Sequence, residues 1–229
     1  MISDFEVSQL LMSKVFHDLA GPVGAMNNGA EFLKESRSDV HQKAIELMQL
    51  SSSQAVSRLE LFKAVLGYSP ANSEVSLNKI KPMISAYFSE KPITFNWKNL
   101  TRPDEINMTS AASKALIISV LIVASSLIYG GSVDIEIDNA KEGKISFITK
   151  AYSPQGVKVE NDAVKILADK NLNLVFNSQN VLYLYTSRLL ENTNGKLELT
   201  RNTNELSFNV TVDNVLNEPE TVSASVADI

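Results

Sequence analysis

The sequence predicts an α+β fold, in which an N-terminal antiparallel helical hairpin forms a dimeric four-helix bundle and is followed by an α/β sandwich. Three observations predict this class. Apolar residues recur at heptad spacing through the first 66 residues, a turn-rich stretch at 68–74 ends that pattern, and helical and alternating segments are mixed beyond it. We therefore expect a helical domain over residues 1–68, a mixed domain over 75–213 and a flexible tail over 214–229.

Two long amphipathic helices make up the predicted hairpin. The first runs from about residue 5 to 35, the second from about 40 to 66, and a short polar turn at 36–39 joins them. The heptad rows are Met12, Leu19, Met26 and Leu33 with Phe16, Val23 and Ala30 in the first helix, and Ile45, Ser52, Leu59 and Leu66 with Met48, Ala55 and Phe62 in the second. A lone hairpin cannot bury an apolar stripe on both sides, so we expect a homodimer.

Helices and strands alternate in the second predicted domain. We expect helices at 77–89, 110–128, 160–170 and 178–192, and strands at 93–98, 133–138, 144–149, 196–201 and 206–212. Gly130 and Gly131 mark a turn between a helix and a strand. The segment 115–129 is very apolar, but its 15 residues fall short of the roughly 20 that span a membrane. It is therefore predicted to be a buried helix.

Composition excludes several classes of chemistry. The chain has no cysteine, which excludes disulfides, cysteine-based zinc sites, iron–sulfur clusters and thiol nucleophiles. A net charge of −5 argues against nucleic acid as the main partner. Asp4 and Glu6 precede the first apolar run and no basic segment stands before it, so we expect no secretory signal, no membrane partner and a cytoplasmic location. With two histidines in the chain, imidazole chemistry depends on His17 or His41.

The surroundings of His17 are unusual for a bundle helix. His17 follows a residue of an apolar row, and its own face is small or polar, so its side chain is predicted to point to solvent. Pro22, inside the helix, costs about 3 kcal/mol, and each glycine nearby costs about 1 kcal/mol. These costs indicate a face that is kinked and cleared for a globular partner. The small or polar residues of this face are Ser13, His17, Gly21, Gly24 and Asn28.

An exposed imidazole without a serine, cysteine or metal partner fits a phosphoryl carrier. Asp18 can bind one imidazole nitrogen and leave the other as the nucleophile. A single surface histidine is most often inert, and it is the combination of His17, Asp18, Pro22 and the glycines that favours function. His41 has no such surroundings and is predicted to be an exposed residue of the first turn of its helix.

Residues 17–33, HDLAGPVGAMNNGAEFL, resemble the phosphoacceptor helix of two-component histidine kinases, where an acid follows the histidine and a proline stands five positions after it. More closely, this segment is similar to the ChpT-type histidine phosphotransferases of alphaproteobacteria, as are residues 57–63 and 178–199. The resemblance implies a dimeric four-helix bundle and a degenerate histidine-kinase ATP-binding domain. It also implies a relay of phosphate from the receiver domain of a hybrid histidine kinase to response regulators.

The motifs with which a kinase domain binds ATP are missing. The apolar helix at 114–128 has no Asn, Asp or Glu, residues 152–156 read YSPQG where an Asp-x-Gly-x-Gly turn would stand, and the nine glycines form no phosphate loop. We therefore expect no cofactor in this chain. Phosphate would come from a partner receiver domain, which would supply Mg²⁺. Gly21 stands where many bifunctional kinases carry a Thr or Asn that orients water, so weak phosphatase activity is predicted.

The resulting hypothesis is a phosphorelay histidine phosphotransferase. His17 is the predicted phosphoacceptor, and Asp18 orients it or accepts its proton. The predicted receiver-docking residues are Ser13, Lys14, Gly21, Pro22, Gly24, Ala25 and Asn28. The alternatives are a scaffold that binds a receiver or kinase and transfers nothing, and an ATP-dependent histidine kinase, which the missing motifs disfavour.

Overall fold

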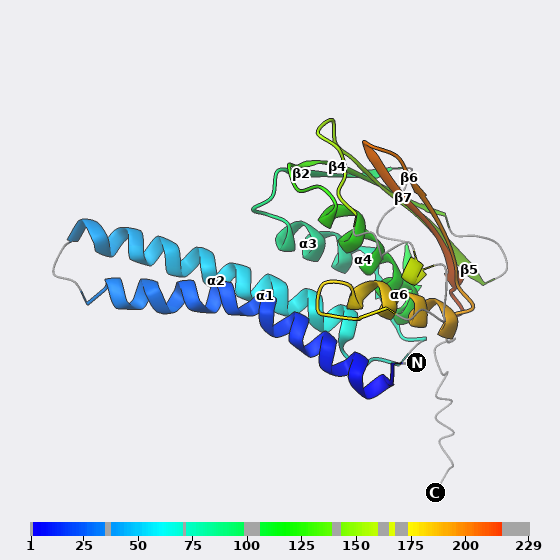
Figure 1. The fold of residues 1–229 in the computed structure, drawn as a ribbon, viewed down its shortest axis with the longest axis horizontal. Helices are drawn as coiled ribbons and strands as arrows, with labels where there is room; N and C mark the ends of the chain where they lie inside the picture. The colour runs from blue at the N-terminus through cyan, green and yellow to red at the C-terminus, as the bar shows by residue number, and fades with distance from the viewer. Residues whose placement is uncertain are drawn as a thin grey trace, which may run out of the picture.

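The computed structural model describes residues 2–34, 38–70, 72–98, 106–138, 143–159, 165–167 and 174–216. A long helical hairpin projects from a body in which helices cover one face of a curved sheet (Figure 1). The predicted α+β class, with N-terminal helices and a sheet-containing part after them, is confirmed.

The hairpin consists of α1 (Asp4–Phe32) and α2 (Ser38–Leu66). A capping box starts α1: the Ser3 hydroxyl accepts from the Glu6 amide, and the Glu6 carboxylate accepts from the Ser3 amide. Both helices are close to the predicted ranges, but α2 begins at residue 38, so the predicted turn at 36–39 is too long. Figure 1 shows that α1 bends part-way along, and its N-terminal part leaves the line of α2.

A five-stranded sheet forms the far side of the body, in the order β2-β4-β5-β7-β6. The strands are β2 (Ile93–Lys98), β4 (Gly131–Asp138), β5 (Lys144–Tyr152), β6 (Lys196–Arg201) and β7 (Glu205–Asp213). Because a helix connects β2 to β4, these two strands pair in parallel, and every other pair in this sheet is antiparallel. All five predicted strands are present, including the predicted hairpin of β4 and β5.

Three described helices lie between the sheet and the hairpin: α3 (Leu77–Tyr87), α4 (Ser110–Ser125) and α6 (Val181–Asn192). The short strands β1 (Glu74–Ser76) and β3 (Asn107–Thr109) pair with each other and were not predicted, because three residues are too few to show alternation. The helix predicted at 160–170 lies outside the described residues except for 165–167, which are helical.

Two predicted boundaries are wrong in an informative way. The apolar helix α4 ends at Ser125 and not at residue 128, and Gly130 and Gly131 then turn the chain into β4 with φ of +87° and +149°. The tail was expected to begin at Asn214. Instead the Asn214 amide donates to the Gly143 carbonyl, and its side-chain oxygen accepts from the Thr109 amide, both at 2.7 Å. Residues 217–229 of the predicted tail lie outside the described residues.

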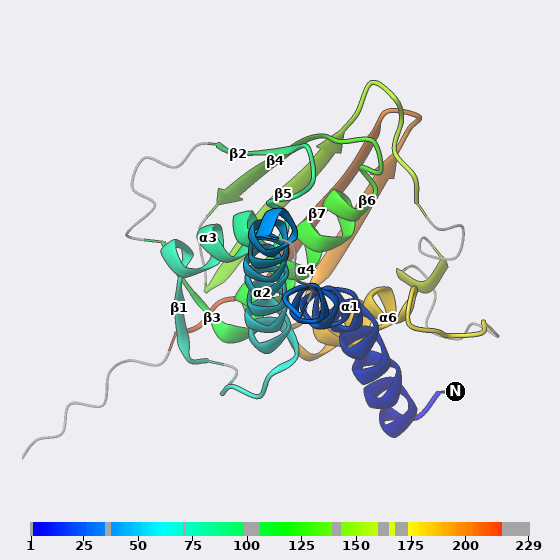
Figure 2. The same ribbon diagram turned by 90° about the vertical axis from the view of Figure 1, so that its left-hand side faces the viewer.

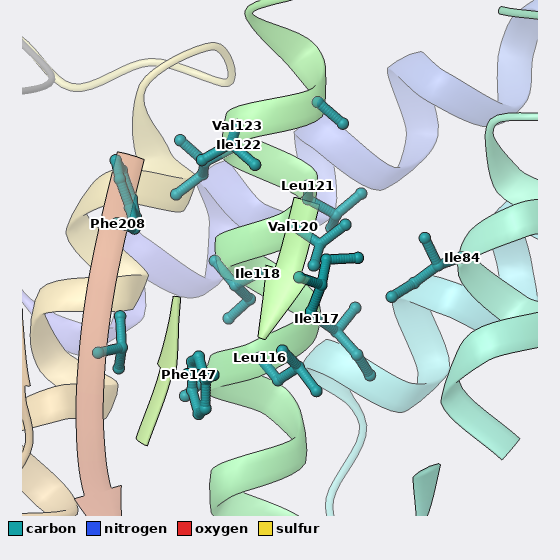
Figure 3. Close-up of a cluster of buried hydrophobic side chains, with 14 of the residues drawn as sticks. Ile84, Leu116, Ile117, Ile118, Val120, Leu121, Ile122, Val123, Phe147 and Phe208 are labelled. Carbon is teal, nitrogen blue, oxygen red and sulfur yellow. The ribbon is translucent and has the colours of Figure 1, made fainter. Parts of the chain in front are cut away.

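The centre of the core is α4, in which 13 of 16 residues are buried. Figure 3 shows its side chains between Phe147 and Phe208 of the sheet and Ile84 of α3. The prediction of a buried helix is confirmed. A helix that is apolar on all sides is stabilised when the sheet and the neighbouring helices remove its surface from water. Among the described residues, no helix combines the length and the apolar character needed to cross a bilayer.

Both helices of the hairpin contact the body. Leu61, Phe62 and Val65 near the end of α2 belong to the same buried cluster as α4. The start of α1 lies beside α6 (Figure 2), where Arg188 donates to the Asp4 carboxylate and to the Ile2 carbonyl. The two halves of α1 therefore pack on different elements, the first on α6 and the second on α2.

Two glycines of α1 differ in the space around them, and this difference is testable. A Cβ on Gly29 would lie 2.5 Å from Cγ of Met48 and 3.1 Å from the Ala44 carbonyl, whereas a Cβ on Gly24 would meet no heavy atom within 4 Å. Both alanine variants gain helix propensity, but overpacking costs about 1–3 kcal/mol. We expect the free energy of unfolding of Gly29→Ala to be lower than that of Gly24→Ala by this amount, measured by urea denaturation. Equal stabilities would contradict the close approach of α1 and α2 at Gly29.

Candidate functional site

His17 lies in the N-terminal part of α1, and its side chain is 81% exposed. The predicted orientation toward solvent is confirmed. Its neighbour Phe16, which the heptad pattern placed in an apolar row, is itself 62% exposed in a single chain. The imidazole is therefore open to a partner, and it stands next to apolar surface that the chain does not cover.

Asp18 holds a fixed place beside the imidazole. Its side chain is only 13% exposed, and its carboxylate accepts from Nζ of Lys14 at 2.5 Å. The other carboxylate oxygen lies 3.2 Å from Nδ1 of His17. Since Asp18 engages Nδ1, Nε2 is the imidazole nitrogen that remains for chemistry with a partner. Lys14 was predicted to dock a receiver, and in the structure its ammonium binds the Asp18 carboxylate.

Pro22 lies inside α1 and is buried. Its predicted place on the exposed docking face is wrong, because the ring faces the interior. Having no amide hydrogen, Pro22 cannot donate to the carbonyl of Asp18 four residues earlier. Arg58 of α2 donates to that carbonyl instead. Sequence reasoning missed Arg58 as a residue of the site, because the contact joins two helices across 40 positions of the chain.

Other charged and polar groups surround Asp18. Burial raises the pKa of the Tyr87 phenol to about 12, and the Asp18 carboxylate adds to this shift. Desolvation lowers the pKa of Lys91, and the positive charges of Lys14 and Arg58 lower it further. The charged groups that contribute to both pKa shifts are Asp18 and its neighbours. The region around Asp18 is thus rich in positive charge.

A cavity of about 500 Å³ adjoins the imidazole. Its walls come from the hairpin and the body together: His17 and Asp18 of α1, Ser125 at the end of α4, Lys158, and Tyr183 of α6. Sequence reasoning did not predict a cavity here, because its walls come from segments that are distant in the chain. A partner that reaches His17 also meets the body of this protein.

The remaining predicted docking residues agree only in part with an exposed face. Ser13, Gly21, Gly24 and Asn28 are exposed, and a Cβ on Gly21 would meet no heavy atom within 4 Å. Ala25 is half-buried. His41 is also half-buried, so its prediction as an exposed residue is wrong. The exposed members form a face with little side-chain bulk beside the imidazole.

Comparison with known proteins identifies the family. The model of the histidine phosphotransferase C-terminal domain matches residues 77–205, which is more than half of the chain. This chain belongs to the histidine phosphotransferase family. The matched residues do not include His17, so the match carries no information about that residue.

Individual proteins are also similar to this chain. The protein phosphotransferase ChpT of Brucella abortus (strain 2308) is 26% identical over 140 residues, which span 61% of this chain and 64% of that relative. A bacterial phosphotransferase solved at 1.7 Å has the same fold, with a TM-score of 0.77, 21% identity, and coverage of 92% of this chain and 98% of that one. The catalytic domain of the histidine kinase ThkA gives a TM-score of 0.42 at 14% identity, covering 62% of this chain and 94% of that domain.

The proximity of Tyr87 to Asp18 predicts a specific pH dependence. The neutral phenol stabilises the fold at pH values below the ordinary tyrosine pKa of 10.0, and this contribution is lost as the pH rises from there toward about 12. We expect Asp18→Asn to lower the pKa of Tyr87, because it removes a negative charge that opposes ionisation. Tyrosine ¹³Cζ shifts measure this pKa, and Tyr87→Phe assigns the resonance. Asp134→Asn, on the sheet, is the control, and an unchanged pKa in Asp18→Asn would contradict the geometry.

Proposed function

We propose that this protein is a phosphorelay histidine phosphotransferase, in which His17 accepts a phosphoryl group from the aspartate of a receiver domain and passes it to response regulators. The observation that carries the proposal is the pairing of an 81% exposed imidazole with an Asp18 carboxylate 3.2 Å from its Nδ1. Membership of the histidine phosphotransferase family supports it.

The geometry suits reversible transfer at Nε2. In the neutral imidazole, Nδ1–H donates to Asp18, and the Nε2 lone pair attacks the phosphorus of the receiver's aspartyl phosphate. The N–P bond forms while the P–O bond to the receiver breaks, and the electron pair leaves on the receiver's carboxylate. The positive charge that develops on the ring is stabilised by Asp18. Reversal of the same step passes the phosphoryl group to a second receiver.

The partner supplies what this chain lacks for that step. Receiver carboxylates hold the Mg²⁺ that neutralises the phosphoryl oxygens, and we expect no cofactor on this chain. In the same proposal, residues 1–68 carry transfer and dimerisation, and residues 75–213 do not use ATP as a phosphoryl donor. The missing ATP-binding motifs in the sequence support this division.

A second copy of the chain would complete the hairpin. Exposed apolar side chains follow heptad spacing on both helices. They are Phe5, Met12, Phe16 and Val23 on α1 and Ile45, Val56 and Leu59 on α2. An apolar stripe of this kind, running along both helices, is the usual interface of a four-helix bundle. We therefore propose a homodimer in which the hairpins pack on each other.

The transfer proposal predicts a labelling pattern. Incubated with a ³²P-labelled receiver domain, the wild-type protein takes up acid-labile label, and His17→Gln loses at least 99% of it because the nucleophile is removed. His41→Gln, in the same hairpin, keeps the label. ATP alone gives no label. Quantitative gels measure the label on the protein, and treatment of the gels with acid and with alkali tests whether the label is acid-labile.

Other outcomes would replace this proposal by one of its alternatives. Binding of the receiver to wild type and to His17→Gln without any label would identify a scaffold. Label taken directly from ATP would identify an autokinase, and label that survives His17→Gln would place the phosphoacceptor elsewhere.

The dimer proposal predicts the effect of one charge on the exposed stripe. We expect Val56→Glu to convert the protein to monomers, because it would bury a carboxylate in the apolar interface, a cost of several kcal/mol. Val175→Glu is the matched control, since Val175 is also exposed but lies outside the hairpin. Light scattering coupled to size exclusion measures the mass. A wild-type monomer at 50–100 μM, or a Val56→Glu dimer, would contradict the proposed interface.

A further inference from the structure

The main-chain carbonyl of Asp18 is affected by the proline in α1, belongs to the residue whose carboxylate contacts His17, and is bound by helix α2. In an uninterrupted helix, the amide of residue 22 would bind this oxygen. Residue 22 is a proline, so this oxygen lacks the usual donor four residues further on. Arg58 of α2 fills the place of the missing amide. The side chain of the same Asp18 binds Lys14 and His17.

We propose that Arg58 is a positioning residue for phosphoryl transfer at His17. By binding the carbonyl that Pro22 leaves free, it fixes the main chain of Asp18, and with it the carboxylate that holds Nδ1 of the imidazole. This role rests on the function proposed above. Arg58 acts through Asp18 and does not itself touch the reacting atoms.

The packing of α1 explains why a separate anchor is needed at this place. The first part of the helix is held to α6 by Arg188, and the later part packs on α2 at Gly29. Between these two attachments the proline interrupts the hydrogen bonds that would make α1 one rigid rod. His17 and Asp18 lie in that interval. Without the bond from α2, both residues would move with the bend.

Arginine suits this position for chemical reasons. Arg58 is half-buried, and its guanidinium is always charged and carries several donors on a planar group. A charge-assisted hydrogen bond to a carbonyl is stronger than the main-chain N–H···O hydrogen bond that the proline removed.

A double-mutant cycle with Pro22 tests this role. The variants are Arg58→Ala, Pro22→Ala and the double variant, and Lys63→Ala, an exposed cation on the same helix, is the control. Pro22→Ala restores an amide that can bind the Asp18 carbonyl, so the arginine becomes dispensable. Two quantities are measured: the initial rate of transfer from a labelled receiver, and the ¹⁵N shifts of the His17 imidazole, which report its bond to Asp18.

We expect Arg58→Ala to reduce the transfer rate about tenfold in the wild-type background and less than twofold in the Pro22→Ala background. The imidazole shifts should move in Arg58→Ala, whereas those of the double variant should match Pro22→Ala. Lys63→Ala should change neither quantity. Equal losses in both backgrounds, or less than a twofold loss in the wild-type background, would overturn the proposal.

The two measurements separate this inference from the proposed function. If wild type takes no label, phosphotransfer is refuted, and the imidazole shifts still decide whether Arg58 acts through the carbonyl of Asp18. If Pro22→Ala alone abolishes transfer, the imidazole shifts likewise decide whether Arg58 acts through the carbonyl of Asp18. If circular dichroism shows that Arg58→Ala is unfolded, recovery of the fold in the double variant supports the proposal, and unfolding of both variants overturns it.

Discussion

A helix cannot continue with all its hydrogen bonds through a proline, and the arrangement around His17 depends on this constraint. Pro22 takes one amide out of α1, the helix bends, and the freed carbonyl belongs to the residue that follows the histidine. The bend lets the first part of α1 lie against α6 while the later part stays on α2. As a result, the imidazole stands at the boundary between hairpin and body, next to a cavity that both parts line.

Apolar side chains are almost completely buried in the body but partly exposed on the hairpin. In the body, α4 lies between the sheet and the neighbouring helices, and nearly all of its residues are removed from water. In the hairpin, each helix has one face covered by the other helix and a second face left open, on which Phe16 and Leu59 remain 62% and 55% exposed. Burying one such side chain is worth about 1.5–3 kcal/mol. A stripe of them on both helices therefore supports the proposed homodimer, which would also bring two His17 sites into one assembly.

Local patterns in the sequence predicted the elements, and tertiary contacts explain most of what it did not predict. Alternation identified β4 and β5, heptad spacing identified the hairpin, and the apolar run identified α4 as buried. The strands β1 and β3 were missed because three residues carry no period. At the site, the exposure of His17 followed from its helical face. The burial of Pro22 and the contact of Arg58 did not, because they depend on how α2 lies against α1, which no local pattern encodes.

Under the proposed function, the charges near Asp18 would affect how long a phosphoryl group stays on His17. Phosphorylation of the imidazole would bring about two negative charges next to a carboxylate, a repulsion that favours onward transfer. Lys14 is bound to that carboxylate at 2.5 Å, and Arg58 binds the main-chain carbonyl of the same residue, so these two cations would offset part of the repulsion. With a net charge of −5 on the whole chain, global attraction to an acidic receiver pocket is not expected. Under the proposed function, the cations near the imidazole would therefore matter more than the net charge of the chain, both for the phosphorylated imidazole and for docking of a receiver.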